Sequence, residues 1–201
     1  DGVNLIVSHI DAPRVDLKQN PLYEDSSIKF GMMKTHYYGG IKKYQWVSTP
    51  LALHGVFVKQ NGEVVNVSIG EDENDPVFVM PDLLPHLARK AQYTQKIGDA
   101  INAGKMNLVF NSIPFKNDDD KVKNAIKLNA LHLLNEKYGV IEANFLSAEL
   151  ELVPAGKARD VGIDRSFVLG YGQDDRICAY TSAEAIFNMK DSEKTAIVYL
   201  A

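Results

Sequence analysis

The sequence contains very little cysteine: Cys178 is the only one among 201 residues. A single cysteine cannot form an internal disulfide, which is typical of proteins kept in a reducing compartment such as the cytoplasm. Cys178 lies in the apolar run 177–180. We therefore expect a small core residue at this position rather than a reactive thiol.

The sequence also lacks long apolar runs and any excess of positive charge. No run approaches the roughly 20 apolar residues that a membrane span needs, and no signal peptide is visible. The 22 Lys and Arg residues stand against 26 Asp and Glu residues, which gives a net charge of -4. These features argue against a membrane or a nucleic acid as the main partner, because nothing supplies a strong positive field.

The remaining composition is that of an ordinary soluble globular protein, with 45% hydrophobic and 24% charged residues. A chain of this length can bury a sizeable core in one large domain or in two small ones. The chain opens with Asp1 directly before a strand-like run and closes with another such run at residues 195–201. Because domains usually begin and end in surface segments, we expect a piece of a longer protein.

The first strand-like run ends in polar residues that could carry chemistry. Residues 3–7 have the apolar, β-branched pattern of a strand that is buried on both faces. His9 and Asp11 follow it, and residues two apart on a strand point to the same side. The carboxyl ends of strands bind ligands in open α/β sheets. His9 could ligate a metal while Asp11 orients it, or the two could form a buried structural pair.

The next segment, residues 16–43, contains many residues that interrupt regular structure. Pro21, the polar stretch 25–27 and the glycine pair 39–40 are such breakers, so we expect an irregular region. Within it, aromatic residues and a histidine at 35–38 run directly into the two glycines. Adjacent glycines let a backbone approach a ligand closely, which indicates either a binding loop or a plain turn.

A β-hairpin is expected after this segment. Residues 55–60 and 63–69 have strand patterns and flank Asn61-Gly62. This dipeptide supplies the two positive φ angles that a type I′ turn requires.

Two helices and a strand are expected next. The first helix begins around Pro81 and directs Leu84, Leu87, Ala88 and Ala91 toward a core, which leaves His86 on another face. The second helix runs over residues 119–138, capped by the aspartates at 118–120 and ended by Gly139. Its apolar stripe comprises Val122, Ile126, Ala130, Leu133 and Leu134. The pattern at 148–153 then predicts a strand that ends at Pro154.

A second polar cluster precedes the last expected helix. Asp174 and Asp175 follow a glycine-rich loop and lead into residues 177–189, which we expect to form a helix packed through Ile177, Tyr180 and Phe187. Two adjacent carboxylates at such a junction could bind a cation or could simply cap the helix.

Four motifs, taken together and in order, resemble a known family. They are the strings 8–14 (SHIDAPR), 38–40 (YGG), 83–87 (LLPHL) and 172–176 (GQDDR). The chain resembles the dinuclear zinc aminopeptidases of the aminopeptidase I and aspartyl aminopeptidase family over essentially its whole length.

The resemblance implies an α/β fold in two domains. A zinc-peptidase sheet domain would comprise residues 1–15 and 165–201. A β-rich dimerisation domain with two helices would be inserted between them at residues 16–164. The family assembles from dimers, so the resemblance also implies self-association and a peptide substrate.

The resemblance further implies roles for individual residues. His9 would ligate one of two zinc ions, Asp175 would bridge both, and Asp11 would support the catalytic base. Zinc commonly takes imidazole and carboxylate ligands, and two ions roughly 3.5–4 Å apart share a ligand. His86 would reach the active site of a neighbouring subunit and help to bind substrate.

The resemblance assigns Tyr38, Gly39 and Gly40 to the lining of the substrate pocket. It also shows what residues 1–201 lack: the family's adjacent Glu-Glu pair, a further aspartate and a carboxyl-terminal histidine ligand. We therefore expect residues 1–201 to bind zinc weakly and to have no peptidase activity alone. The alternatives are a non-catalytic dimerisation or assembly module and a metal-free β domain that binds carbohydrate or peptide.

Overall fold

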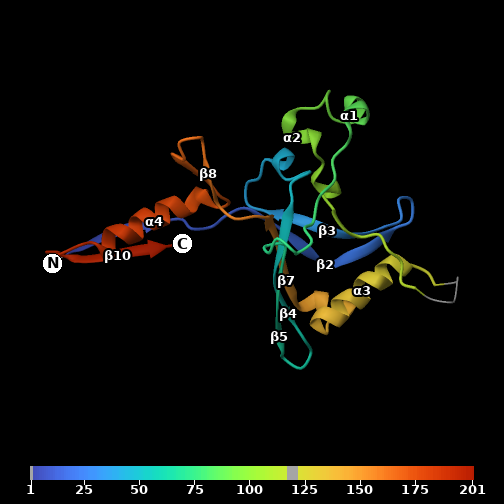
Figure 1. The fold of residues 1–201 in the computed structure, drawn as a ribbon. Coiled ribbons are helices and arrows are strands. Elements are labelled where there is room, and N and C mark those ends of the chain that lie inside the picture. The colour runs from blue at the N-terminus through green and yellow to red at the C-terminus, as the bar shows by residue number, and fades with distance from the viewer. Residues whose placement is uncertain (1, 117–121) are drawn as a thin grey trace. The chain divides into compact units, whose positions relative to one another are not determined.

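The computed structural model describes residues 2–116 and 122–201, and they form two compact units (Figure 1). The terminal unit comprises Asp1–Pro13 and Lys157–Ala201, and the central unit comprises Arg14–Gly156. The first limit lies two residues before the expected domain boundary, and the second lies eight residues before it. The reason is that Arg14 already belongs to the central sheet, whereas residues after Gly156 pair within the terminal unit.

The central unit is built on a six-stranded sheet in the order β5-β4-β7-β2-β3-β6, and neighbouring strands are antiparallel. The strands are β2 (Arg14–Asp25), β3 (Phe30–Tyr38), β4 (Leu51–Val58), β5 (Val64–Ile69), β6 (Leu108–Asn111) and β7 (Ala148–Pro154). The strand expected at 148–153 is thus confirmed. The alternation of its apolar and charged residues places Leu150 and Leu152 in the core.

The core of the central unit is formed by this sheet, by helix α3 (Ala125–Tyr138) and by residues of the connecting segments such as Trp46 and Met80. Ile126, Ala130 and Leu134 are buried, and their spacing of four residues places them on one helix face. Phe57 on β4 packs edge-to-face against Phe145, with ring centroids 5.2 Å apart. The unit therefore buries its own apolar surface.

The expectation that residues 16–43 are irregular is wrong. Strands β2 and β3 pair over most of this segment, and the residues that we took for breakers lie at its irregular points. Pro21 lies where the register shifts between Leu17 and Leu22, so its missing N–H interrupts no regular ladder. The connection between the strands is a tight turn in which Asp25 Oδ1 accepts the Ser27 N–H at 2.9 Å.

The expected hairpin is confirmed as β4 and β5, but the expected turn type is wrong. The Lys59 N–H donates to the Glu63 carbonyl at 2.8 Å, and the Gly62 N–H donates to the Lys59 carbonyl at 2.9 Å. Of the three residues between Lys59 and Glu63, only Gly62 has a positive φ, 84°. This is a three-residue loop with glycine in the left-handed position rather than a two-residue type I′ turn.

The first expected helix begins later than predicted, as α1 (Pro85–Ala91). The residue before a proline is disfavoured in the helical region, and Leu84 is accordingly extended with ψ of 150°. Ala88 is buried, whereas Leu84 and Leu87 are 61% and 53% exposed, so the expected core face is wrong. A short helix, α2 (Ile97–Ala100), follows.

The second expected helix begins at residue 125 rather than 119. Its predicted aspartate cap at 118–120 lies outside the described residues. The Glu24 carboxylate of β2 instead accepts the N–H groups of Ile126 and Lys127, at 3.0 and 3.2 Å. The predicted end is confirmed, because Gly139 adopts a left-handed φ of 63° and donates to Asn135. Leu133 from the expected apolar stripe is half exposed.

The terminal unit contains a parallel pair of strands, β1 (Val3–Ser8) and β10 (Thr195–Leu200), with helix α4 (Gln173–Phe187) alongside both (Figure 1). Two short strands, β8 (Arg159–Val161) and β9 (Phe167–Leu169), form a separate hairpin. This mixed architecture confirms the expected α/β class. Across the described residues, no helix has the length and apolar character needed to cross a membrane.

Three expectations about burial in the terminal unit are wrong. The side chains of β1 are mostly exposed, because among the described residues the strand has one neighbouring strand and one helix. Helix α4 buries Ala179 and Ser182 rather than the larger side chains Ile177, Tyr180 and Phe187. Cys178 is exposed and is not a core residue.

Candidate metal site

The structure brings together two side chains that lie far apart in the sequence. His9 follows the last residue of β1, and Asp175 lies in the first turn of α4. Their Nδ1 and Oδ2 atoms are 2.5 Å apart, and the side chains are 61% and 33% exposed. An imidazole and a carboxylate therefore meet at the carboxyl end of a parallel strand pair, where α/β proteins bind ligands.

The backbone around His9 is held by its pairing with β10. The Ala201 N–H donates to the Ser8 carbonyl at 3.0 Å, and the Ile10 N–H donates to the Ala201 carbonyl at 2.8 Å. His9 thus lies between two ladder bonds. Its position is fixed by regular strand pairing rather than by a loop.

The start of α4 places Asp175 beside His9. Gly172 precedes the helix with φ of 79°, a conformation that glycine adopts without steric cost. Asp174 has non-helical angles of φ -91° and ψ 110°, and the peptide bond between Asp174 and Asp175 is cis. The Arg176 N–H then donates to the Gly172 carbonyl at 3.3 Å. Asp175 is therefore at the first fully helical turn, facing the end of β1.

The three carboxylates near this point influence one another. A hydrogen bond between Asp174 and Asp175 raises the pKa of Asp174 and lowers the pKa of Asp175. His9 lowers the pKa of Asp175 further, whereas the charge of Asp11 raises it. The Asp174 and Asp175 carboxylates therefore interact closely, and a cation beside them would relieve the repulsion between their charges.

Asp11 also has a local structural role. Its Oδ1 atom accepts the N–H of Ala12 at 2.9 Å, where the chain leaves β1. Its effect on the pKa of Asp175 places its charge near the histidine and the aspartate pair. The structure therefore gathers His9, Asp11 and Asp175 at one end of the terminal unit.

The donor set fits part of a zinc site. Imidazole nitrogen and carboxylate oxygen are both ordinary zinc ligands, and zinc usually has four. Among the described residues, however, no group of three or more His, Cys, Asp or Glu side chains has the arrangement to hold a metal ion. His9 and Asp175 can therefore supply some of the ligands but not a complete set.

The other predicted site residues lie in the central unit. His86 is exposed on α1, Tyr38 is the last residue of β3, and Gly39 and Gly40 follow that strand. Gly39 has φ of 75°, which a residue with a side chain rarely adopts. The glycine pair therefore ends strand β3.

Sequence reasoning missed the residue that holds Tyr38. The Arg14 guanidinium lies over the Tyr38 ring, 4.2 Å from its centroid. Arg14 Nε also contacts Asp16 Oδ1 and Glu151 Oε1, each at 2.9 Å. The only available signal was that Arg14 ends the motif 8–14, and nothing in the spacing links it to residue 38.

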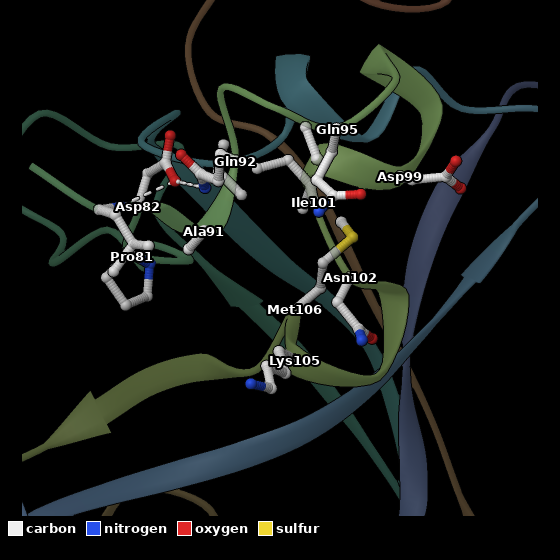
Figure 2. A pocket seen from close by; sticks show the side chains of 13 residues that line it. Pro81, Asp82, Ala91, Gln92, Gln95, Asp99, Ile101, Asn102, Lys105 and Met106 are labelled. Atoms are coloured by element: carbon white, nitrogen blue, oxygen red, sulfur yellow. Dashed lines mark hydrogen bonds between the residues drawn. The ribbon is translucent and has the colours of Figure 1, made fainter. Parts of the chain in front are cut away.

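The central unit also contains a hollow of about 480 Å³ that the sequence did not indicate (Figure 2). Buried Ile101 and Met106 line it, and Gln95 and Asp99 are among its polar lining residues. On its wall, Asp82 Oδ1 accepts a hydrogen bond from Gln92 Nε2 at 2.7 Å, drawn dashed in Figure 2. None of the predicted site residues lines this hollow.

Known proteins resemble this chain over nearly its whole length. The family model described as Aminopeptidase I zinc metalloprotease (M18) matches residues 1–200. A probable M18 family aminopeptidase 1 of Clostridium acetobutylicum is 57% identical over 199 residues, which cover 99% of this chain and 42% of that protein. A crystal structure of an M18 family aminopeptidase from Thermotoga maritima has a TM-score of 0.88 and 47% identity, over 99% of this chain and 42% of that chain.

The fold also extends to more distant proteins. The mApe1 dodecamer of S. cerevisiae has a TM-score of 0.62 at 20% identity, over 99% of this chain and 43% of that chain. The family model that matches this chain describes a class of zinc metalloproteases. Within that class, the chain belongs to the aminopeptidase I, or M18, family. It spans about two fifths of the length of the relatives that it matches, 42% in the Clostridium protein.

Proposed function

We propose that this chain is part of a zinc aminopeptidase that removes the N-terminal residue from peptides. The observation that carries the proposal is the contact of His9 with Asp175, at 2.5 Å, at the carboxyl end of the parallel strand pair. The M18 family match supports it. Each of the two residues is a suitable zinc ligand, and neither has an evident role in burying a core.

The residues would divide the work as follows. His9 would hold one zinc ion, and Asp175 would use its two carboxylate oxygens to bridge a pair of ions. Asp11 would orient the catalytic base. The bound metal would supply Lewis-acid polarisation of the peptide carbonyl and a water of lowered pKa. The physiological ion could also be cobalt or manganese, since similar ligands accept them.

The two units would have different tasks. The terminal unit would belong to the catalytic domain, and the central unit would serve in dimerisation and present Tyr38, Gly39, Gly40 and His86 to substrate. The dodecameric assembly of the mApe1 structure supports self-association. The single cysteine supports a reducing, cytoplasmic location.

Residues 1–201 alone would be inactive. The chain spans 42% of its Clostridium relative, and its described residues supply an incomplete ligand set. Peptidase assays with and without EDTA on residues 1–201 and on the full-length protein test this. We expect EDTA-sensitive activity in the full-length protein alone, and its loss in Asp175→Asn. The matched control is Asp99→Asn, which changes an aspartate of the central unit. Full activity in Asp175→Asn would contradict the proposal.

The competing proposal is an assembly module without catalysis. It is supported by the central unit, which forms its own core and sheet. Sedimentation of residues 1–201 separates the two ideas in part, because a monomer at micromolar concentration would argue against autonomous dimerisation. An inactive full-length protein that still assembles would favour the module.

A further inference from the structure

We propose that Ser182, acting through Ser8, is a positioning residue that holds His9 against Asp175. This inference rests on the proposed function, because it concerns residues that would support the metal ligands. It does not follow from the family resemblance, whose motifs include Ser8 but assign no role to it and do not include Ser182.

The two serines form a buried hydrogen bond between β1 and α4. Their Oγ atoms are 2.5 Å apart, and each residue is 8% exposed. Ser182 Oγ also donates to the Cys178 carbonyl at 2.7 Å. A hydroxyl has one hydrogen, so Ser8 must be the donor in the bond to Ser182. These two serines are also the only buried polar residues of the terminal unit within the part of the chain that the structure describes.

This hydrogen bond joins the two elements that carry the proposed ligands. Ser8 immediately precedes His9 in the chain. Ser182 follows Asp175 by seven residues, which is close to two helical turns, so both side chains project from the same face of α4. The bond therefore fixes the helix that carries Asp175 to the strand that carries His9.

A second hydrogen bond ties the same two segments together on the other side of His9. The Tyr171 hydroxyl donates to the Pro13 carbonyl at 2.5 Å. The segment 8–13, which contains His9 and Asp11, is thus attached at both ends to the segment 171–182. Of the two attachments, the serine pair is the buried one, so water competes with it less.

The alternative is that the serines only stabilise the fold. Burial of a polar pair is costly unless both groups are satisfied, and an apolar contact would hold the helix and strand together equally well. What an apolar contact would not supply is a fixed distance and direction between the two segments. A positioning role therefore predicts an effect on metal binding that exceeds the effect on stability.

The test uses the full-length protein with Ser8→Ala, Ser182→Ala and the double variant. The readouts are the dissociation constant for Co²⁺ and the visible absorption spectrum of the bound Co²⁺, with thermal unfolding of the metal-free protein measured alongside. We expect each single variant to bind Co²⁺ about tenfold more weakly, the size of effect seen when groups that orient metal ligands are removed. The double variant should be no weaker than either single variant, because one bond is lost in all three.

Thr181→Ala is the matched control. Thr181 directly precedes Ser182 in α4 and is exposed, and its hydroxyl donates to carbonyls of its own helix, at 3.0 Å to Ile177 and 3.1 Å to Cys178. It should leave the Co²⁺ spectrum and affinity unchanged. Variants at Ser8 and Ser182 that bind Co²⁺ like the control, or losses that add in the double variant, would overturn the positioning role.

Two further outcomes are distinguishable. If Ser182→Ala does not fold, Ser8→Ala against the control decides the question by itself. If the unchanged full-length protein binds no Co²⁺ or Zn²⁺, the proposed function fails and the positioning role fails with it. Normal metal binding with unaffected variants overturns the positioning role alone.

Discussion

The two units of this chain differ in how far they bury their apolar side chains. The central unit surrounds residues such as Leu53, Phe57 and Leu152 with sheet and helix, so that each is 2% exposed or less. The terminal unit exposes Val3, Leu5 and Val7 on β1, at 56% to 60%. The central unit therefore carries most of the hydrophobic stabilisation, and the terminal unit carries the candidate metal ligands.

This contrast separates the main hydrophobic core from the candidate metal ligands along the chain. The described residues of the terminal unit include His9, Asp11 and Asp175 together, yet few of its apolar side chains are buried. The packing of the central unit does not account for the position of His9. Substitutions that unfold the central unit therefore report on stability rather than on the His9 contact. Substitutions at that contact should change chemistry with little effect on the central core.

The largest effect on the central unit is expected from Gly55→Ala. Gly55 has φ of +135°, and an added Cβ would lie 1.9 Å from the Glu149 carbonyl oxygen of the neighbouring strand. The pairing of β4 with β7 would have to open, which we expect to reduce the free energy of unfolding by about 4 kcal/mol. Denaturant unfolding of residues 1–201 followed by fluorescence of the buried Trp46 measures it.

The control for that substitution is Gly98→Ala. Gly98 lies in α2, and nothing lies within 4 Å of an added Cβ. Its effect should be below about 1 kcal/mol and in the stabilising direction, because alanine restricts the unfolded chain. Equal behaviour of the two variants would show that the close approach at Gly55 is not maintained in solution.

The next largest effect is expected from removing a buried leucine of the central unit, and the same change in the terminal unit should have little effect. Leu152→Ala in the central unit removes a side chain that is 0% exposed, and we expect a loss of about 3 kcal/mol. Leu5→Ala in the terminal unit removes one that is 58% exposed, with an expected change within about 0.5 kcal/mol. Circular dichroism during denaturation measures both variants of residues 1–201. A large loss in Leu5→Ala would mean that β1 is covered in solution.

Sequence patterns predicted the fold where periodicity and turn chemistry were both present. The strand at β7 and the end of α3 at Gly139 are examples. The strands β2 and β3 were missed because Pro21 is placed at a shift in register, which cannot be seen without the partner strand. The same limit applies to burial: β1 is apolar enough for a core strand, but its burial depends on neighbours rather than on its own residues.

The candidate site was predictable only in outline. The motifs 8–14 and 172–176 indicated His9, Asp11 and Asp175, and the structure places these three at one end of the terminal unit. Their meeting depends on parallel pairing of β1 with β10. The bond between Ser8 and Ser182 was not predictable, because nothing in the sequence around either serine indicates a partner 174 residues away.

A smaller effect concerns the start of α3. The Glu24 carboxylate accepts the N–H groups of Ile126 and Lys127, so it caps the helix and interacts favourably with its dipole. We expect Glu24→Ala to lower the free energy of unfolding by about 1 kcal/mol. Glu24→Gln should lose less, because it retains an oxygen acceptor. Glu73→Ala, in an exposed loop, is the control, and an equal loss there would show that Glu24 does not cap the helix.

The smallest expected effect is a pH dependence that differs in sign between two glutamates of the central unit. Burial raises the pKa of Glu151 above its ordinary value of 4.5, although Arg14 partly opposes the change. The folded state then holds more protons than the unfolded state as pH rises from 4.5 to the raised pKa, so stability falls across that window. Bonding to Lys59 lowers the pKa of Glu63 below 4.5, so its contribution is lost as pH falls through that lowered pKa.

Unfolding of residues 1–201 and of Glu151→Gln and Glu63→Gln, measured between about pH 3 and pH 7, tests these signs. The stability of the unsubstituted protein relative to Glu151→Gln should decrease as pH rises above 4.5. Relative to Glu63→Gln it should increase as pH rises toward 4.5. If both differences moved in the same direction, burial would not dominate at Glu151, and the Arg14 ion pair would be the stronger influence there.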